Sequence, residues 1–369
     1  MYEFSLLDMT PYIIMVWVLF HFNDLKINYI VKAKYCFVAI LIFACIRYDV
    51  GYDYHTYVQL VLRDADQYVL ENVEPLSKIF MDIGFYSHYQ VYFILSSIIT
   101  LYPLYKIFTK YSINPAYSFL IYFLFPQFYL ESQSIVRNAV AFSIVFYASM
   151  LLLEKSYAKS LLCVIVAFLF HKSALIGLMI YPLYWIGFNR KLHIAAYVVS
   201  FFITVVVMRY VGAYADQIQL LSAIEGYAED GRSEGGTMKL ILNGIAILNL
   251  FYWDRIAKLN KNNGYFLSLF NLGVCLWNVF LSVDSTIALR FSSYFILSIL
   301  LLVPQYKYLA PERKKLKVSR CVTSFFLLLF ISYFTLCIKA YLQKPDRMSN
   351  VPYRTIFYHS NYKNYPLYD

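Results

Sequence analysis

The sequence has few charged residues. Asp, Glu, Lys and Arg make up only 15% of its 369 residues, against roughly 25% in soluble domains. Hydrophobic residues make up 60% of the chain, and the mean hydropathy is +0.55. These values exclude an ordinary soluble domain and indicate a protein that crosses a membrane several times.

Metal-ligand spacings and Cys-x-x-Cys pairs are also missing. The six cysteines lie inside apolar runs, where cysteine behaves as a small hydrophobic residue: Cys36, Cys45, Cys163, Cys275, Cys321 and Cys337. We therefore expect no disulfide, no metal and no cofactor. A metal held by Asp49, Asp53 or Glu74 stays open as an alternative.

The N-terminus lacks the basic region of a secretory signal and carries Glu3 and Asp8 instead. We therefore expect the first apolar run to be a true membrane span. Judged against the ~20 residues that a bilayer requires, twelve spans are expected, and the fold class is an all-α polytopic membrane protein. They are roughly 4–22, 31–46, 89–108, 114–131, 134–153, 158–171, 173–189, 192–211, 238–253, 264–282, 286–304 and 319–342.

The basic residues set the expected orientation. With both termini periplasmic, the inward loops are 23–34, 106–113, 154–160, 189–191, 254–263 and 305–320. These loops hold 18 of the 32 Lys and Arg but only four of the 22 Asp and Glu. The positive-inside rule then accounts for the net charge of +10, and no nucleic-acid partner is expected.

We expect one integral membrane domain, 1–369, with three long periplasmic segments. The segment 47–88 carries an amphipathic helix at 74–86, which is too short and polar to cross and is expected to lie at the interface. The segment 212–237 is an acidic loop, read either as a lid or as a plain connector. The segment 343–369 is a C-terminal tail.

The unusual charges fall at the periplasmic ends of these spans. Charged groups at membrane depth are costly and usually functional. Six residues from separate segments are expected at the same membrane boundary: Arg47, Asp53, Glu74, Arg137, His171 and Arg290. For each residue alone, a structural ion pair is the competing interpretation, but their shared depth favours a site.

The residue types indicate the ligand chemistry of such a site. Arginine pairs with phosphates through its planar fork, so Arg47, Arg137 and Arg290 are candidates for binding a lipid-linked phosphate. Carboxylates bind sugar hydroxyls, and tyrosine rings stack on sugars. The candidate sugar-binding residues are Tyr54, Tyr57 and Tyr353.

The sequence resembles the EpsG family of bacterial exopolysaccharide proteins and, through it, the Wzy-type O-antigen polymerases. The first matching stretch holds Arg47, Gly51, Asp53, Tyr54 and Tyr57. Further matching stretches follow in the same order at 74–76, 137–142, 170–175, 289–295 and 351–353. Tyr52 and Asn138 depart from the family pattern, and neither departure removes a charged position.

The resemblance implies a glycosyltransferase of the bacterial inner membrane with its active site facing the periplasm. It would move a glycan from one undecaprenyl diphosphate to the non-reducing end of another lipid-linked repeat unit. The expected partners are these donor and acceptor lipids and the membrane lipids, and a chain-length regulator protein is left open. The candidate bases are His171, Asp53 and Glu74, and the sequence does not choose among them. The resemblance makes Arg47, Arg137 and Arg290 the expected ligands of the diphosphate, and His171 is also a candidate donor to it.

Three other functions compete with this interpretation. An O-antigen ligase would move the glycan to lipid A core with the same donor chemistry. A flippase for the lipid-linked repeat would need charges near the bilayer midplane and inverted repeats. An acyltransferase would need a buried histidine with access to an acyl donor from the inner face.

Overall fold

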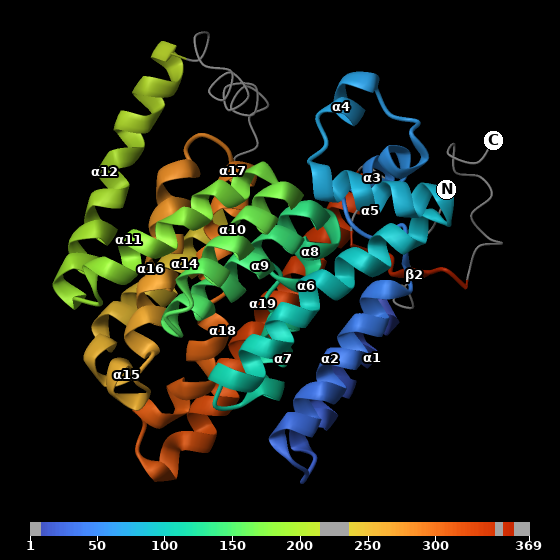
Figure 1. The fold of residues 1–369 in the computed structure, drawn as a ribbon. Coiled ribbons are helices and arrows are strands. Elements are labelled where there is room, and N and C mark those ends of the chain that lie inside the picture. Colours follow the sequence, from blue (N-terminus) through green and yellow to red (C-terminus); the bar gives the residue numbers. More distant parts are fainter. Residues whose placement is uncertain (1–8, 215–235, 344–349, 358–369) are drawn as a thin grey trace. The chain divides into compact units, whose positions relative to one another are not determined.

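The computed structural model describes residues 9–214, 236–343 and 350–357. The chain is almost entirely helical (Figure 1), which confirms the all-α class. Helices are the natural solution for long apolar segments, because they satisfy every backbone hydrogen bond within the segment. Most of the expected 212–237 loop, and the expected tail apart from Gln343 and residues 350–357, lie outside the described residues.

The chain divides into two compact units. The first unit comprises Met1–Ser143, Leu169–His171 and Arg320–Asp369, and the second comprises Ile144–Phe168 and Lys172–Ser319. Elements of the first unit are α1 (Thr10–Asp24), α2 (Tyr29–Cys45), β1 (Arg47–Tyr48), α3 (Tyr54–Leu62), α4 (Gln67–Glu71), α5 (Pro75–Tyr86), α6 (Tyr89–Tyr111), α7 (Pro115–Leu124), α8 (Tyr129–Ser134), the start of α9 (Val136–Leu153), most of α19 (Lys315–Gln343) and β2 (Arg354–Thr355).

The second unit holds the rest of α9, nearly all of α10 and the elements up to the start of α19. These elements are α10 (Tyr157–Phe170), η2 (Lys172–Met179), α11 (Ile180–Ile186), α12 (Arg190–Tyr214), α14 (Gly236–Phe251), α15 (Trp253–Leu259), α16 (Asn263–Phe280), α17 (Ser285–Ile296), α18 (Ile299–Leu302), η4 (Val303–Leu309) and η5 (Glu312–Lys314). Within this unit α16 is almost wholly buried and packs against α12 and α17.

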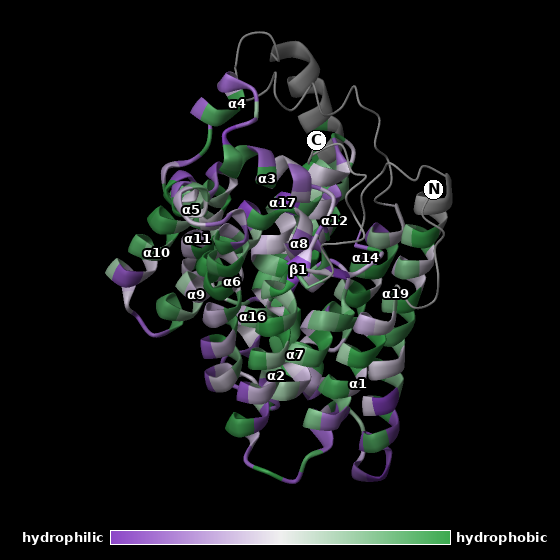
Figure 2. Ribbon diagram, turned by 90° about the vertical axis from the view of Figure 1, so that its right-hand side faces the viewer, coloured by the Kyte–Doolittle hydropathy of each residue, from purple (hydrophilic) through white to green (hydrophobic). Residues whose placement is uncertain are grey.

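Helical structure coincides with each expected span within the described residues. Four helical segments are long and apolar enough to cross a membrane by themselves, namely Tyr89–Tyr111, Val136–Leu153, Ser285–Leu309 and Glu312–Ile338. A fifth is obtained if Gly236–Phe251 and Trp253–Leu259, which meet at a bend of 76°, count as one span. Figure 2 shows apolar flanks on α1, α2 and α7. The protein is membrane-embedded, and the count of twelve spans and the position of the termini stay predictions.

The polar segment after α2 differs from the expected loop. Its helix at 74–86 is present as α5, but α3 and α4 precede it where a loop is expected. A cluster of buried side chains, including Tyr57, Val61, Met81 and Tyr92, stabilises α3 and α5 by joining them to α6. The apolar face of α5 is thus partly used for packing within the first unit. The expected span 114–131 is also divided, into α7 and α8, around Pro126.

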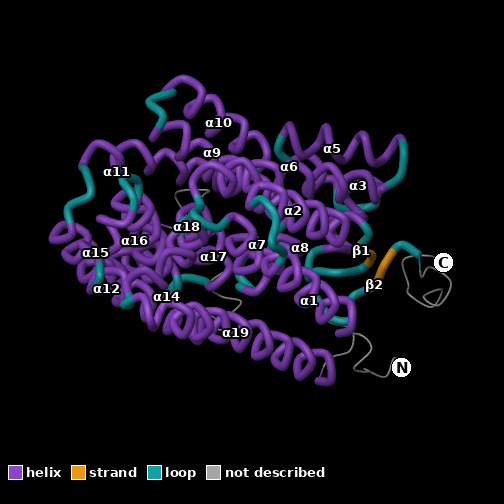
Figure 3. Tube along the Cα trace, turned by 90° about the horizontal axis from the view of Figure 1, so that it is seen from below, coloured by secondary structure: helices purple, strands orange, loops and turns teal. Residues whose placement is uncertain are grey.

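In the first unit, a two-stranded antiparallel ladder joins β1, directly after α2, to β2. Arg47 pairs with Thr355 and Tyr48 with Arg354, and Ile356 N–H donates to the Ile46 carbonyl over 3.0 Å. Figure 3 shows β2 lying beside β1. The ladder carries residues from near the C-terminus back to the end of α2, the point at which the candidate site begins.

Candidate functional site

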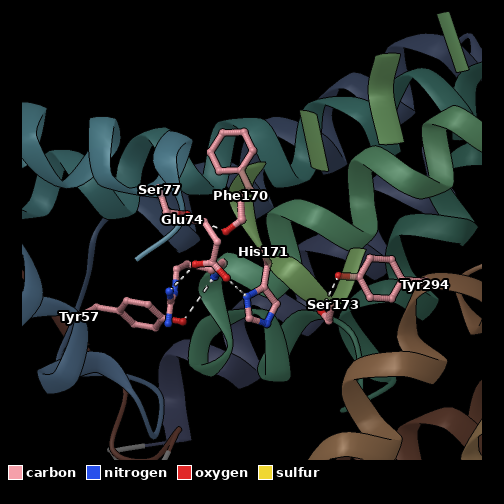
Figure 4. A network of polar contacts seen from close by, with 8 residues as sticks. Tyr57, Glu74, Ser77, Phe170, His171, Ser173 and Tyr294 are labelled. Atoms are coloured by element: carbon pink, nitrogen blue, oxygen red, sulfur yellow. Dashed lines mark hydrogen bonds and ion pairs between the residues drawn. The ribbon is translucent and has the colours of Figure 1, made fainter. Parts of the chain in front are cut away.

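Glu74 lies at the centre of a polar cluster in the first unit (Figure 4). Its Oε2 accepts a hydrogen bond from Arg137 Nη1 over 2.6 Å, and its Oε1 lies 3.0 Å from His171 Nδ1. The Glu74 side chain is only 5% exposed, whereas those of Arg137 and His171 are 23% and 16% exposed. The structure therefore brings together three of the sequence-predicted site residues, and the side chains of Arg137 and His171 are partly exposed.

Helix ends place these three side chains. Glu74 is the N-cap residue of α5, directly before Pro75 at the first helical position, where proline is favoured. Arg137 lies in the first turn of α9, and His171 directly follows the last residue of α10. Termini of three helices therefore meet: Arg137 and His171 lie at the ends of predicted spans, and Glu74 lies at the start of the predicted interfacial helix.

Two contacts fix the end of α10 against α5. Ser77 Oγ donates a hydrogen bond to the Phe170 carbonyl over 2.8 Å, and the rings of Phe80 and Phe170 meet edge to face at 5.2 Å. Phe170 immediately precedes His171, so these contacts limit how far the imidazole can move away from Glu74. Residues that support an active-site group in this way set the accuracy of its geometry.

Tyr57 of α3 forms one wall of the cluster. Its hydroxyl accepts a hydrogen bond from the Arg137 backbone N–H at 3.4 Å, and the guanidinium carbon of Arg137 lies 5.9 Å from the centre of its ring. Tyr57 is 5% exposed. Little of its surface is therefore open to a sugar, and its contact with sugar stays a prediction.

The hydrogen bonds of Glu74 indicate how the cluster can act. Both carboxylate oxygens are engaged, one by a guanidinium and one by an imidazole. When a neutral histidine donates through Nδ1, its other nitrogen, Nε2, is the basic one. A carboxylate that orients an imidazole in this way also stabilises the imidazolium that forms when Nε2 takes a proton. This arrangement suits proton transfer next to a cation.

Arg47 occupies a different environment from Arg137. It is 1% exposed, and its Nη1 donates to the carbonyls of Val50, at 3.1 Å, and Gln133. Its guanidinium also lies 4.9 Å from the centre of the Phe93 ring. Burial lowers the pKa of the Arg47 guanidinium from its ordinary value. With these contacts, Arg47 fixes the 47–51 turn against α8.

The 47–51 turn requires a glycine at position 51. Its φ is +108°, which side chains rarely adopt, and a Cβ atom there would collide with the backbone of Gln133. The next residue, Tyr52, donates its backbone N–H to Ser134 Oγ over 3.0 Å. A glycine at this position is required both for the backbone conformation and for the close approach of the turn to α8.

The other sequence-predicted residues of the first unit lie around α3 and β2. Asp53 is half-buried at the N-cap position of α3, and its charge interacts with that of Glu131 on α8. Tyr54 stacks on Phe93 with ring centres 4.5 Å apart. Tyr353 stacks on Phe43 at 4.1 Å, so one face of each tyrosine ring is covered, and their contact with sugar stays a prediction.

Arg290 is the remaining predicted site residue. It is half-buried on α17, in the second unit. In the same unit Ser173 of η2 and Tyr294, one turn further along α17, share a hydrogen bond of 2.8 Å between their hydroxyls. The proposed contact of Arg290 with diphosphate stays a prediction.

Sequence reasoning missed a second cluster in the first unit. Asp49 lies between a histidine and an arginine: its Oδ1 is 2.7 Å from His55 Nε2, and its Oδ2 pairs with Arg354. The signal was incomplete, because Asp49 and His55 are close in sequence but Arg354 is 305 residues from Asp49. Among the described residues, no three His, Cys, Asp or Glu side chains gather as a metal site would require.

Comparison with known proteins identifies the family of the chain. The family model described as the EpsG family matches residues 34–355, nearly the whole chain. No curated protein matches, and no solved structure matches. The family match includes both the Glu74 cluster and the Asp49 cluster.

Proposed function

The chain belongs to the EpsG family, a Wzy-like polymerase family of polysaccharide biosynthesis, and from this membership we propose the reaction. The protein extends a glycan by moving it from one undecaprenyl diphosphate to the non-reducing end of another lipid-linked repeat unit. The reaction takes place on the periplasmic face of the bacterial inner membrane. The observation that supports this proposal most directly is the cluster of Arg137, Glu74 and His171, in which a base and a cation share one buried carboxylate.

The roles follow from what the reaction needs. The acceptor hydroxyl loses its proton to His171 Nε2, and its oxygen forms a bond to the anomeric carbon of the donor sugar. The bond between that carbon and the diphosphate oxygen breaks, and its electron pair leaves with the diphosphate. Arg137 meets this charge, because its planar fork can bind two phosphate oxygens at once. We propose Arg290 as a further diphosphate ligand.

Glu74 then acts as a positioning residue. Its two oxygens are engaged by Arg137 and His171, so it holds the base and the cation at fixed places instead of taking the proton itself. Asp53 remains the alternative base. We propose that Arg47 keeps the 47–51 turn in place and makes no contact with substrate, because its guanidinium is buried and bonded to backbone carbonyls.

Replacing Arg137 tests the role of the fork. Arg137→Lys keeps the charge and loses the planar geometry, so polymer formation should fall by at least about tenfold if one charge-assisted bond is lost. Arg63→Lys is the matched control, because Arg63 forms an exposed pair with Asp82 at 3.0 Å in the same segment. Near-normal polymer with Arg137→Lys would show that only a general counter-charge is needed.

The products of the cell test the polymerase assignment itself. In a strain without the protein, the proposal expects acceptors that carry a single repeat unit and no longer chains. Loss of every glycan-bearing acceptor would instead indicate a ligase or a flippase. The measurement is the length distribution of the glycan on a gel, compared with the strain that carries the wild-type chain.

A further inference from the structure

We propose that the second unit carries a surface that binds the headgroups of anionic phospholipids, formed by a basic segment at residues 307–317. This segment comprises the end of η4, all of η5 and the start of α19. Its basic residues are Lys307, Arg313, Lys314, Lys315 and Lys317. The orientation of the chain in the membrane accounts for an excess of positive charge here but requires no lipid contact. The proposal is also independent of the polymerase reaction.

Most of the positive charge in the 307–317 segment has no carboxylate beside it. Its five basic residues stand against a single acid, Glu312, whose carboxylate pairs with Lys315. Arg313, Lys314 and Lys317 are exposed, and no described carboxylate pairs with any of them. Exposed cations without a counter-charge from the protein are available to an anion from outside it.

A tyrosine ring gathers the other two cations of the segment. The Nζ atoms of Lys307 and Lys315 lie 5.1 Å and 4.7 Å from the centre of the Tyr308 ring, which are cation–π distances. The Tyr308 side chain is 43% exposed, and that of Leu316 is 63% exposed. Apolar side chains beside lysine ammonium groups suit the boundary between lipid headgroups and acyl chains.

The 307–317 segment connects two candidate membrane spans. Ser285–Leu309 and Glu312–Ile338 are both long and apolar enough to cross a membrane, and the segment includes the last residues of the first and the first residues of the second. The basic side chains therefore occupy a turn at the end of two spans, which is the level of the phospholipid phosphates. In the expected topology this turn faces the cytoplasm.

These features favour an anionic phospholipid over other anions. Clusters of four to eight Lys and Arg next to a membrane helix are typical of binding to anionic lipid headgroups. A phospholipid offers its phosphate to the cations and its acyl chains to Tyr308 and Leu316. An acidic protein segment would match the charges but would leave these two side chains without an apolar partner.

Titration of the wild-type chain with short-chain lipids tests the proposal. The purified full chain in a neutral detergent is titrated with dihexanoyl phosphatidylglycerol and, separately, with dihexanoyl phosphatidylcholine. The anionic lipid should bind at least about tenfold more tightly, because it adds a charge-assisted contact that the zwitterionic lipid lacks. Salt at about 1 M, where the Debye length is about 3 Å, should remove this preference.

A triple substitution assigns the preference to the segment. Removing the three unpaired charges should reduce the affinity for phosphatidylglycerol to that for phosphatidylcholine; the changes are Arg313→Gln, Lys314→Gln and Lys317→Gln. The matched control also removes one arginine and two lysines, all exposed, from the expected inward loop 254–263 of the same unit: Arg255→Gln, Lys258→Gln and Lys261→Gln. This control should keep the wild-type preference, because its charges lie outside the segment.

A charge-conserving exchange guards against loss of the fold. The variant with Arg313→Lys, Lys314→Arg and Lys317→Arg should keep the preference for the anionic lipid, and thermal unfolding reports the folded fraction of every variant. Loss of the preference by a folded exchange variant would show that charge is not what binds the lipid and would overturn the proposal.

The remaining outcomes are equally decisive. Equal binding of the two lipids by the wild type, retained preference after the glutamine substitutions, or an equal loss in the loop control would each overturn the proposal. Tighter binding of a polyglutamate peptide than of phosphatidylglycerol would indicate a protein partner instead and overturn the lipid assignment. None of these results affects the polymerase assignment, which the length distribution of the glycan tests separately.

Discussion

Glu74→Gln tests most directly how the candidate site works. The substitution removes one negative charge and keeps the size of a side chain that is 5% exposed. Glutamine has one oxygen and one amino group in place of two equivalent oxygens, so it can no longer accept from both Arg137 and His171. If Glu74 acts by orienting His171, the variant should lose the fixed orientation of the imidazole but keep His171 as its base.

The expected size of the effect follows from the bond between Glu74 and His171, which is 3.0 Å long and has a charged acceptor. Such a bond contributes about 1.5–3 kcal/mol, and each 1.4 kcal/mol in the barrier changes the rate about tenfold. Glu74→Gln should therefore lower turnover by about 10-fold to 150-fold. If Glu74 were itself the base, the loss should reach about 10²–10⁴-fold.

Because these ranges overlap, a double-mutant cycle decides between the two roles. If Glu74 works through His171, the double variant Glu74→Gln with His171→Gln should lose much less activity than the product of the two single losses, by about fivefold or more. Residues that act as a unit show this lack of additivity. The assay is initial-rate glycan transfer by purified chain in nanodiscs, at saturating lipid-linked repeat unit.

A control cycle pairs Glu74→Gln with His88→Asn, for which the losses should simply multiply. Thermal unfolding of each variant shows whether the folded fraction is comparable. Multiplying losses in the Glu74–His171 cycle would refute the positioning role. Near-normal turnover of His171→Gln would remove His171 as the base and leave Glu74 or Asp53 to take the proton.

Two further predictions concern the turn that supports the site and the orientation of the chain. Gly51→Ala should lower the melting temperature more than Gly187→Ala: both glycines have positive φ, but only at Gly51 would a Cβ atom meet the backbone of Gln133. Gly187→Ala then isolates the conformational cost, about 1–3 kcal/mol, and an equal or smaller effect at Gly51 would show that the turn is not held against α8. Reporter fusions at Asp66 should read periplasmic and those at Lys315 cytoplasmic, and an inverted result at both would overturn the periplasmic placement of the site.

The sequence alone determined the class of the protein and most of its helices. A segment that crosses lipid must satisfy its backbone hydrogen bonds locally, so apolar runs such as 89–108 and 134–153 predict α6 and α9 without knowledge of their neighbours. The same reasoning places Arg137 and His171 at helix ends, because charged groups are excluded from the interior of a span, and Pro75 places Glu74 at the start of the interfacial helix. Their shared position at such ends was enough to predict a site.

Only the tertiary structure decided which of these residues meet and what each can do. Arg47 and Arg137 both carry a guanidinium at the end of a predicted span. Arg47 is buried against backbone carbonyls, whereas Arg137 is partly exposed beside a carboxylate. The Asp49 cluster depends on strand pairing between residues about 300 positions apart. Pairing of this kind follows from how helices and strands pack, and the hydrophobic pattern along the chain does not predict it. For this reason the sequence predicted where charged residues gather, and the packing of the first unit determined which of them form the Glu74 and Asp49 clusters.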